Sequence, residues 1–196
     1  MGYVFISIAI YLASLVVAAY AITAVLNIKK EENEGRTELI VDKKVSRIQW
    51  MSSHLIVAAL YSAALLLAMG MAGGLAYGLM TGDLSKGFWD ILGMNIAKIP
   101  PVWILLGFTA LLYGFWPRIT SLAWVLWLAF ILLELGWEAQ LVEWSLLQIS
   151  PFSFAHYTIA ISNLPMFPLL CLVGISALLT GIGLLGFKNR DVLTKA

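Results

Sequence analysis

Five long apolar runs are the feature that most constrains what this 196-residue chain can fold into. Hydrocarbon offers the backbone no hydrogen-bond partner, so a membrane segment must satisfy its own amides, and about 20 consecutive apolar residues do this as an α-helix. The runs are continuous rather than alternating, which argues against the strands of an outer-membrane barrel. The sequence therefore predicts an all-α integral membrane fold, a single domain (residues 1–196) with five transmembrane helices: 3–28, 48–80, 101–116, 119–137 and 164–187.

Composition supports the same class. The chain is 61% hydrophobic and 12% charged, with a mean hydropathy of +0.91, whereas soluble domains average about 45–50% apolar and 25% charged residues. The first run lacks a basic leading segment and is longer than the apolar core of a signal peptide, so we expect a retained helix.

Two segments between the runs are apolar enough to touch the membrane without crossing it. Residues 81–100 contain Phe88 and Trp89 and suit a short interfacial helix, and Pro100–Pro101 should prevent the third membrane helix from starting earlier. Residues 138–163 should dip into the outer leaflet, broken in two at Pro151.

The distribution of basic residues predicts orientation. Ten of the twelve Lys and Arg residues lie on one side of the predicted bundle, in residues 29–54, at Arg118 and in the carboxyl-terminal tail, and two, Lys86 and Lys98, lie on the other. Cytoplasmic loops carry the excess of positive charge. We therefore expect the amino terminus outside and the carboxyl terminus in the cytoplasm.

The cytoplasmic segment 29–47 is both acidic and basic, which suits docking to a protein, whereas nucleic acid binding has no electrostatic basis here. Residues 37–44 can form a short helix with one apolar side. Ser46 and Gln49 match a capping box, in which side chains satisfy the free backbone donors at a helix start. The second membrane helix should therefore begin near Arg47.

Small residues predict where helices pack. Gly70, Gly74 and Gly78 recur every four residues, so they form a stripe that another helix can approach closely, and Ala177 and Gly181 repeat this more weakly. The single Cys171 lies in the fifth run, where we expect a small core residue.

Chemistry-bearing residues are few. The chain has no Gly-x-x-x-x-Gly-Lys-Ser/Thr loop, so we expect no cofactor on it, and any ATP–Mg should bind another chain. Glu134, Glu138 and His156 are candidates for a substrate or ion pathway at the outer face, although solvated carboxylates and an interfacial histidine are the simpler expectation. His54 should lie too far from His156 to share a metal with it.

The order of several short motifs resembles the permease subunits of type-2 ABC exporters, in particular the branch that exports polyketide antibiotics. The matching residues are Glu34-Gly-Arg-Thr-Glu-Leu-Ile40, Lys44-Val-Ser-Arg47, Trp50, Ser53-His-Leu55, Ser150-Pro-Phe152 and Gly186-Phe-Lys-Asn-Arg-Asp191. The resemblance covers nearly the whole chain, with Lys44 standing where the family commonly has proline.

This resemblance implies a transporter subunit rather than an enzyme. Residues 33–46 would act as a coupling helix that seats on a separate ATPase subunit, with Glu34, Gly35, Arg36, Glu38 and Arg47 carrying the coupling. A family half-domain has six helices, so a preceding helix or a second permease half is an expected partner, together with the lipid bilayer. Antibiotic export, and hence resistance, across a bacterial plasma membrane is the implied role.

Two alternatives stay open at this stage. One is a small membrane enzyme that uses Glu134, Glu138 and His156 at its outer face, which convergence of the three on a pocket with a metal or lipid would favour. The other is an accessory or immunity membrane protein that transports nothing and copurifies without an ATPase.

Overall fold

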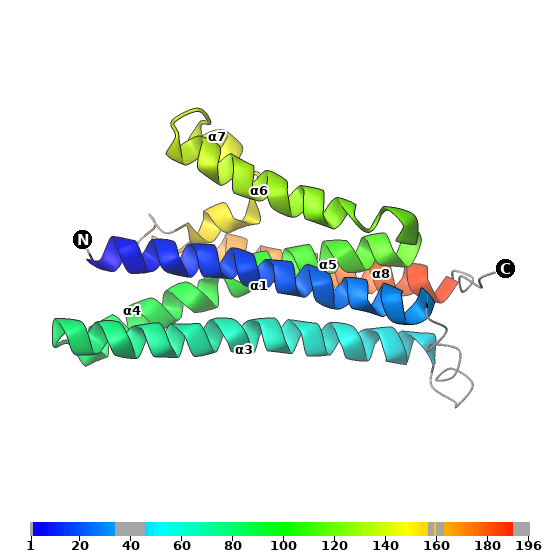
Figure 1. Cartoon of the computed structure of the whole chain (residues 1–196), viewed down its shortest axis with the longest axis horizontal. Helices are drawn as coiled ribbons and strands as arrows, with labels where there is room; N and C mark the ends of the chain where they lie inside the picture. The colour runs from blue at the N-terminus through cyan, green and yellow to red at the C-terminus, as the bar shows by residue number, and fades with distance from the viewer. Residues whose placement is uncertain (1, 34–45, 157–158, 160–162, 190–196) are drawn as a thin grey trace.

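The computed structural model describes residues 2–33, 46–156, 159 and 163–189, and these residues contain helices and no strand. Figure 1 shows the long helices running roughly along one axis. The helical elements, in chain order, are α1 (Gly2–Asn33), α3 (Arg47–Thr81), α4 (Leu84–Ala97), α5 (Ile99–Phe115), η1 (Pro117–Ile119), α6 (Leu122–Glu138), α7 (Trp144–Leu147), η2 (Pro151–Ala155) and α8 (Met166–Asn189).

Helix α3 begins where the sequence predicts. The Ser46 side chain accepts a hydrogen bond from the Gln49 amide at 3.2 Å, and the Gln49 side chain accepts one from the Ser46 amide at 3.1 Å. This reciprocal pair satisfies two amide donors that the first turn would otherwise leave open. The predicted capping box is therefore confirmed, and it defines where the chain re-enters the bundle.

Helix α4 differs from the interfacial helix that we expected for residues 81–100. It turns back after Gly82, whose φ of 74° is easy only for glycine, and packs along the second half of α3 with Ile91 and Asn95 buried. Pro100 and Pro101 lie in the first turn of α5, where no backbone donor is needed, so α5 follows α4 after one residue. The third apolar stretch therefore runs from Gly87 to Phe115 instead of starting at residue 101.

The glycine stripe of α3 lies against α4. A Cβ atom on Gly74 would be 2.9 Å from the Phe88 carbonyl oxygen, and one on Gly78 would be 2.9 Å from the Leu84 Cα. On Gly70 it would be 3.0 Å from the Asn95 Cβ. Any larger residue would separate these two backbones, so the stripe permits the hairpin of α3 and α4.

A second close approach, which we did not predict, joins α5 to α8. A Cβ atom on Gly107 would be 2.7 Å from the Ser176 carbonyl oxygen, and one on Gly183 would be 2.6 Å from the Ala110 carbonyl oxygen. By contrast, Gly181 has open space where a Cβ would be, and Cys171 is exposed on the bundle surface. The expectation that Cys171 is a core residue is therefore wrong.

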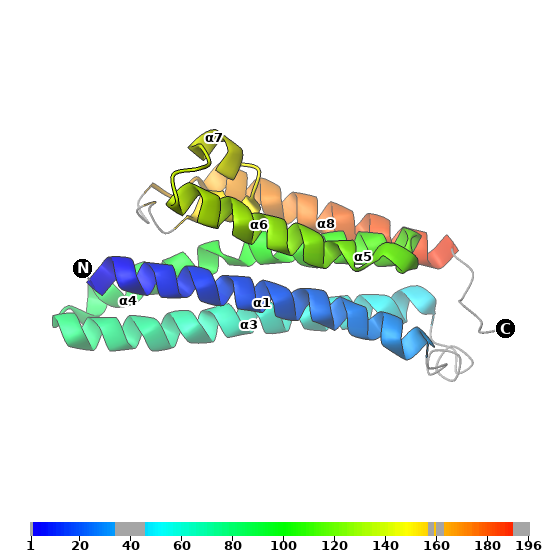
Figure 2. The ribbon, with the colours of Figure 1, turned by 45° about the horizontal axis from the view of Figure 1, so that its top comes forward.

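Helix α5 lies at the centre of the bundle and contacts α1, α3, α6 and α8. Figure 2 shows α1 and α3 on one side of α5, and α6 and α8 on the other. The main core joins buried residues of α1 to Met51 and Leu66 of α3 and to Leu105 and Tyr113 of α5. Trp103 ties α5 to α3, because its indole donates to the Ala59 carbonyl at 3.2 Å.

Four helical stretches of the described chain are long and apolar enough to cross a membrane: Phe5–Glu32, Arg47–Thr81, Gly87–Phe115 and Met166–Asn189. Helix α6 has 17 residues, the lower limit for a span, so a fifth span stays a prediction. The end of α1, the start of α3, η1 and the end of α8 lie at one end of the bundle (Figure 1). That common end is the one for which the charge count predicts the cytoplasm.

Candidate functional site

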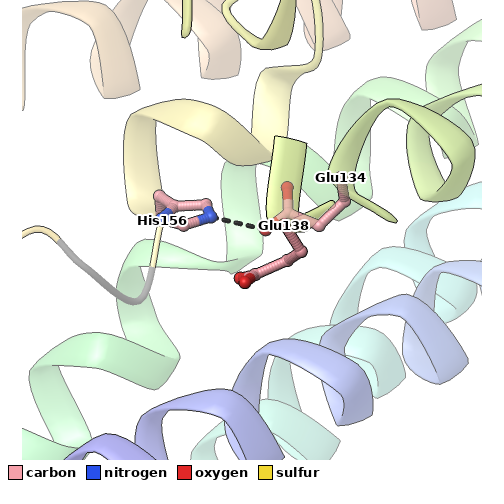
Figure 3. Close-up of side chains that lie close together, drawn as sticks. All are labelled: Glu134, Glu138 and His156. Carbon is pink, nitrogen blue, oxygen red and sulfur yellow. Dashed lines mark hydrogen bonds and ion pairs between the residues drawn. The ribbon is translucent and has the colours of Figure 1, made fainter. Parts of the chain in front are cut away.

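Three of the candidate residues converge at the opposite end of the bundle. Glu134 and Glu138 lie one turn apart on α6, and His156 follows η2 directly. Pro151 is the first residue of η2, at the position where we expected the segment 138–163 to be broken in two. One ligand atom from each of the three side chains lies within 4.8 Å of the other two. Figure 3 shows the three side chains lying close together between α6 and the end of η2, with His156 pointing toward Glu134.

Burial distinguishes these residues from solvated surface groups. His156 is 1% exposed and Glu134 is 6% exposed, and the His156 Nε2 contacts Glu134 Oε1 directly. Glu138 is exposed. The simpler expectation of an interfacial histidine and solvated carboxylates is therefore wrong for His156 and Glu134 and holds for Glu138. The difference arises because α7 and η2 return over the end of α6, which a local sequence pattern cannot show.

Aromatic rings hold the His156 imidazole in place. The ring centroids of Trp137 and Trp144 lie 4.9 Å and 5.4 Å from the His156 centroid, with nearly perpendicular planes, and the Tyr11 centroid lies at 5.8 Å. Edge-to-face contacts of this kind favour one ring orientation. The surrounding rings therefore keep Nε2 facing Glu134.

A buried cation completes the cluster. Lys98, at the junction of α4 and α5, is 2% exposed, and its Nζ donates to the Ala155 carbonyl and lies 4.4 Å from the centroid of the Tyr11 ring. Lys98 and Tyr11 both interact electrostatically with Glu134. The charge count placed Lys98 in an exterior loop and missed this role, although an isolated lysine inside an apolar stretch signals a specific partner.

The other histidine lies at the far end of the molecule. His54 Nε2 is 3.8 Å from Glu31 Oε2, and its ring packs against Trp50 at 5.1 Å. Nearby, the Tyr113 hydroxyl donates to the buried Glu32 carboxylate at 2.6 Å. The two histidines thus belong to separate sites, and the pairing of Glu32 with Tyr113 had no distinguishing sequence signal.

Most of the predicted coupling residues cannot be placed. Glu34, Gly35, Arg36 and Glu38 lie outside the described residues. Arg47 is the first residue of α3 and is partly buried. It lies at the same end of the bundle as η1 and the end of α8.

An apolar groove runs between α3, α5 and α8. Its volume is about 350 Å³, and its lining residues are apolar except for Ser52, Trp103, Ser176 and Thr180. Its lining also includes Ala177 and Gly181, the two small residues on α8 that the sequence analysis identified as a weak packing motif. A groove of this composition fits an apolar or amphipathic molecule, since such sites combine apolar walls with few polar groups.

Taken together, the fold defines a helical multi-pass membrane protein with a buried charged cluster near one end and an apolar groove along its side. Residues 1–188 match the family described as the C-terminal domain of the multidrug efflux system permease Rv1217c, and the chain belongs to this family. The chain is 35% identical over 189 residues to the multidrug efflux system permease protein Rv1217c of Mycobacterium tuberculosis (strain ATCC 25618 / H37Rv).

That alignment covers 96% of this chain and 34% of the relative, so the chain spans about a third of the length of the protein that it matches. The family supports a permease region of a transporter, and the expectation that the chain is not an enzyme stays a prediction. The resemblance to the branch that exports polyketide antibiotics stays a prediction.

Proposed function

We propose that the chain is the membrane-embedded permease part of an ATP-driven exporter of amphipathic or hydrophobic compounds, such as antibiotics, in a bacterial plasma membrane. Membership of an efflux permease family over residues 1–188 is the observation that carries the proposal. ATP–Mg would bind a partner ATPase, and a second permease half would complete the pathway.

Residues 33–46 are the proposed coupling segment. They connect the end of α1 to the start of α3, and both of these helix ends have strong contacts inside the bundle. Glu32 of α1 is hydrogen-bonded to Tyr113 of α5. Trp50 of α3 packs against Phe187 of α8, with ring centroids 6.1 Å apart. A force on the segment would therefore act on four helices.

The contacts continue from one helix to the next. Phe187 also stacks on Tyr113 at 5.4 Å, so the anchors of α1 and α3 share a partner. The apolar groove lies next to the contact between Trp50 and Phe187, since Ser52 and Leu184 are among its lining residues. Movement of α3 relative to α8 would change the width of the groove, which gives alternating access a physical route to the substrate.

Charge reversal at Glu38 and Arg36 tests this assignment. The variants Glu38→Lys and Arg36→Glu should lose copurification with the proposed partner ATPase, and should lose stimulation of ATP hydrolysis by an exported compound. Glu143→Lys is the matched control, because Glu143 is exposed at the other end of the bundle. Unchanged copurification and unchanged stimulation in both test variants would count decisively against the proposed coupling segment.

The two alternatives are not favoured by the family. An accessory or immunity protein would purify without any ATPase, so the same experiment separates it from a permease. A membrane enzyme would use the cluster of Glu134, Glu138 and His156, for which binding of a metal ion is a simpler role than catalysis.

A further inference from the structure

We propose that Glu134, Glu138 and His156 bind a divalent transition-metal ion of the zinc class, which links His156, at the end of η2, to the end of α6. This inference concerns a site separate from the proposed coupling segment and does not depend on the transported compound. It is carried by the donor set, by an oxygen without a hydrogen bond and by the local charge.

The donor set suits such an ion. One imidazole nitrogen and two carboxylate oxygens lie within 4.8 Å of one another. Zinc is bound by histidine nitrogen at about 2.0–2.1 Å and by carboxylate oxygen at about 2.0–2.2 Å, so two ligands of one ion are roughly 3–4 Å apart. The exposed Glu138 side chain can approach by rotating, whereas His156 Nε2 and Glu134 Oε1, which are in direct contact, would have to separate to admit the ion. A water molecule can reach the open side as a fourth ligand.

The buried carboxylate has spare ligand capacity. Glu134 Oε1 contacts His156, whereas Glu134 Oε2 is buried and has no partner that meets full hydrogen-bond geometry among the described residues; the Tyr11 hydroxyl is the polar group that interacts with this carboxylate. A buried carboxylate oxygen without such a partner is costly, because it has lost its hydration. A metal ion between the Glu134 and His156 side chains would satisfy this oxygen.

The local charge also calls for a cation. Around a neutral His156 imidazole, the charged groups that face the site are Glu134 and Glu138 on α6 and Lys98 at the junction of α4 and α5, together with the Tyr11 hydroxyl of α1. Two carboxylates and one ammonium leave an excess of one negative charge. A divalent metal ion would more than compensate this negative charge, and the three-ligand geometry favours such an ion.

The histidine is already oriented for binding. Trp137 and Trp144 pack against its ring edge-to-face, and Nε2 faces Glu134 (Figure 3). Because the His156 ring is already held in one orientation, little conformational entropy is lost when the ion binds, and the affinity for the ion is higher. Metal bonds would then hold His156, at the end of η2, more tightly against α6 than its direct contact with Glu134 does.

The experiment uses the full chain, purified in detergent with a tag that contains no histidine. The chain has only two histidines and one cysteine, so the double variant His54→Gln, Cys171→Ser leaves His156 as the one imidazole. Co²⁺ is titrated into this protein and followed by its visible absorption spectrum, and Zn²⁺ is then added to displace it. Glu138→Gln is the test variant, because Glu138 is exposed and its loss should not affect folding, and Glu143→Gln is the matched control.

We expect one equivalent of Co²⁺ to bind, with a spectrum that shows nitrogen and oxygen ligands and that disappears when Zn²⁺ is added. Loss of even an outer-shell partner weakens metal sites about 10- to 100-fold, so Glu138→Gln should weaken binding at least that much, and Glu143→Gln should not. Zn²⁺ should also raise the melting temperature of the parent protein and not that of Glu138→Gln. Absence of stoichiometric binding, or equal affinity in the two variants, would overturn the proposal.

Discussion

The close approach of α5 and α8 makes Gly183→Ala the most direct test of the packing. The added Cβ would lie 2.6 Å from the Ala110 carbonyl oxygen, 0.8 Å short of the 3.4 Å at which ordinary van der Waals contact begins. The atom that it meets belongs to the backbone of α5 and cannot rotate away. The two helices would therefore have to separate along the contact that Gly107 and Gly114 also form.

The magnitude follows from two opposing effects. Overpacking in a well-packed interior costs about 1–3 kcal/mol, whereas replacing glycine by alanine inside a helix contributes roughly 0.5–1 kcal/mol in favour of folding. Gly181→Ala is the matched control on the same helix, because nothing lies within 4 Å of its Cβ position. The helix preference is common to both variants and cancels, so Gly183→Ala should be less stable than Gly181→Ala by about 1–3 kcal/mol.

Reversible unfolding in mixed detergent micelles measures this difference as a free energy of unfolding. Gly181→Ala should match or exceed the parent protein. Equal stability of the two variants, or a less stable Gly181→Ala, would refute the packing of α5 against α8 at Gly183.

Three further predictions follow from the structure. Glu134→Gln replaces the buried carboxylate that contacts His156 and should lower the free energy of unfolding by about 1.5–3 kcal/mol, whereas the exposed Glu138→Gln should change it by less than about 0.5 kcal/mol. Tyr113→Phe removes the 2.6 Å hydrogen bond to Glu32 and should cost about 1.5–3 kcal/mol in the same assay. In a Cys171→Ser background, a membrane-impermeant maleimide should label Leu141→Cys on intact cells and Arg118→Cys only after permeabilisation; the reverse pattern would contradict the predicted orientation.

Much of the secondary structure was predictable because it depends on neighbouring residues. Each apolar run must form a helix in hydrocarbon, and all five predicted runs contain helices. The start of α3 was predictable to the residue, since the capping box of Ser46 and Gln49 is a contact between positions three apart. The alternation of helix direction also places the end of α1, the start of α3 and the end of α8 at one end of the bundle, as Figure 1 shows.

The candidate site was predictable only as a set of residue types. Glu134 and Glu138 share a helix face because they are four residues apart, and their depth was the open question. Burial of Glu134 depends on α7 and η2 folding back over α6, and on Lys98 arriving from a segment about 40 residues earlier. No local sequence pattern predicts that α7 and η2 fold back over α6 or that Lys98 approaches Glu134.

The sequence by itself determined the secondary structure of this protein. It showed which segments form apolar helices, where α3 begins, and that a charged segment connects the first two helices. The tertiary structure alone decided that α4 lies along α3, that α5 meets α8 at Gly183, and that His156 joins Glu134 in the interior. The physical reason is that helix formation in a membrane depends on each segment's own backbone, whereas the environment of a charge depends on which distant segments exclude water from it.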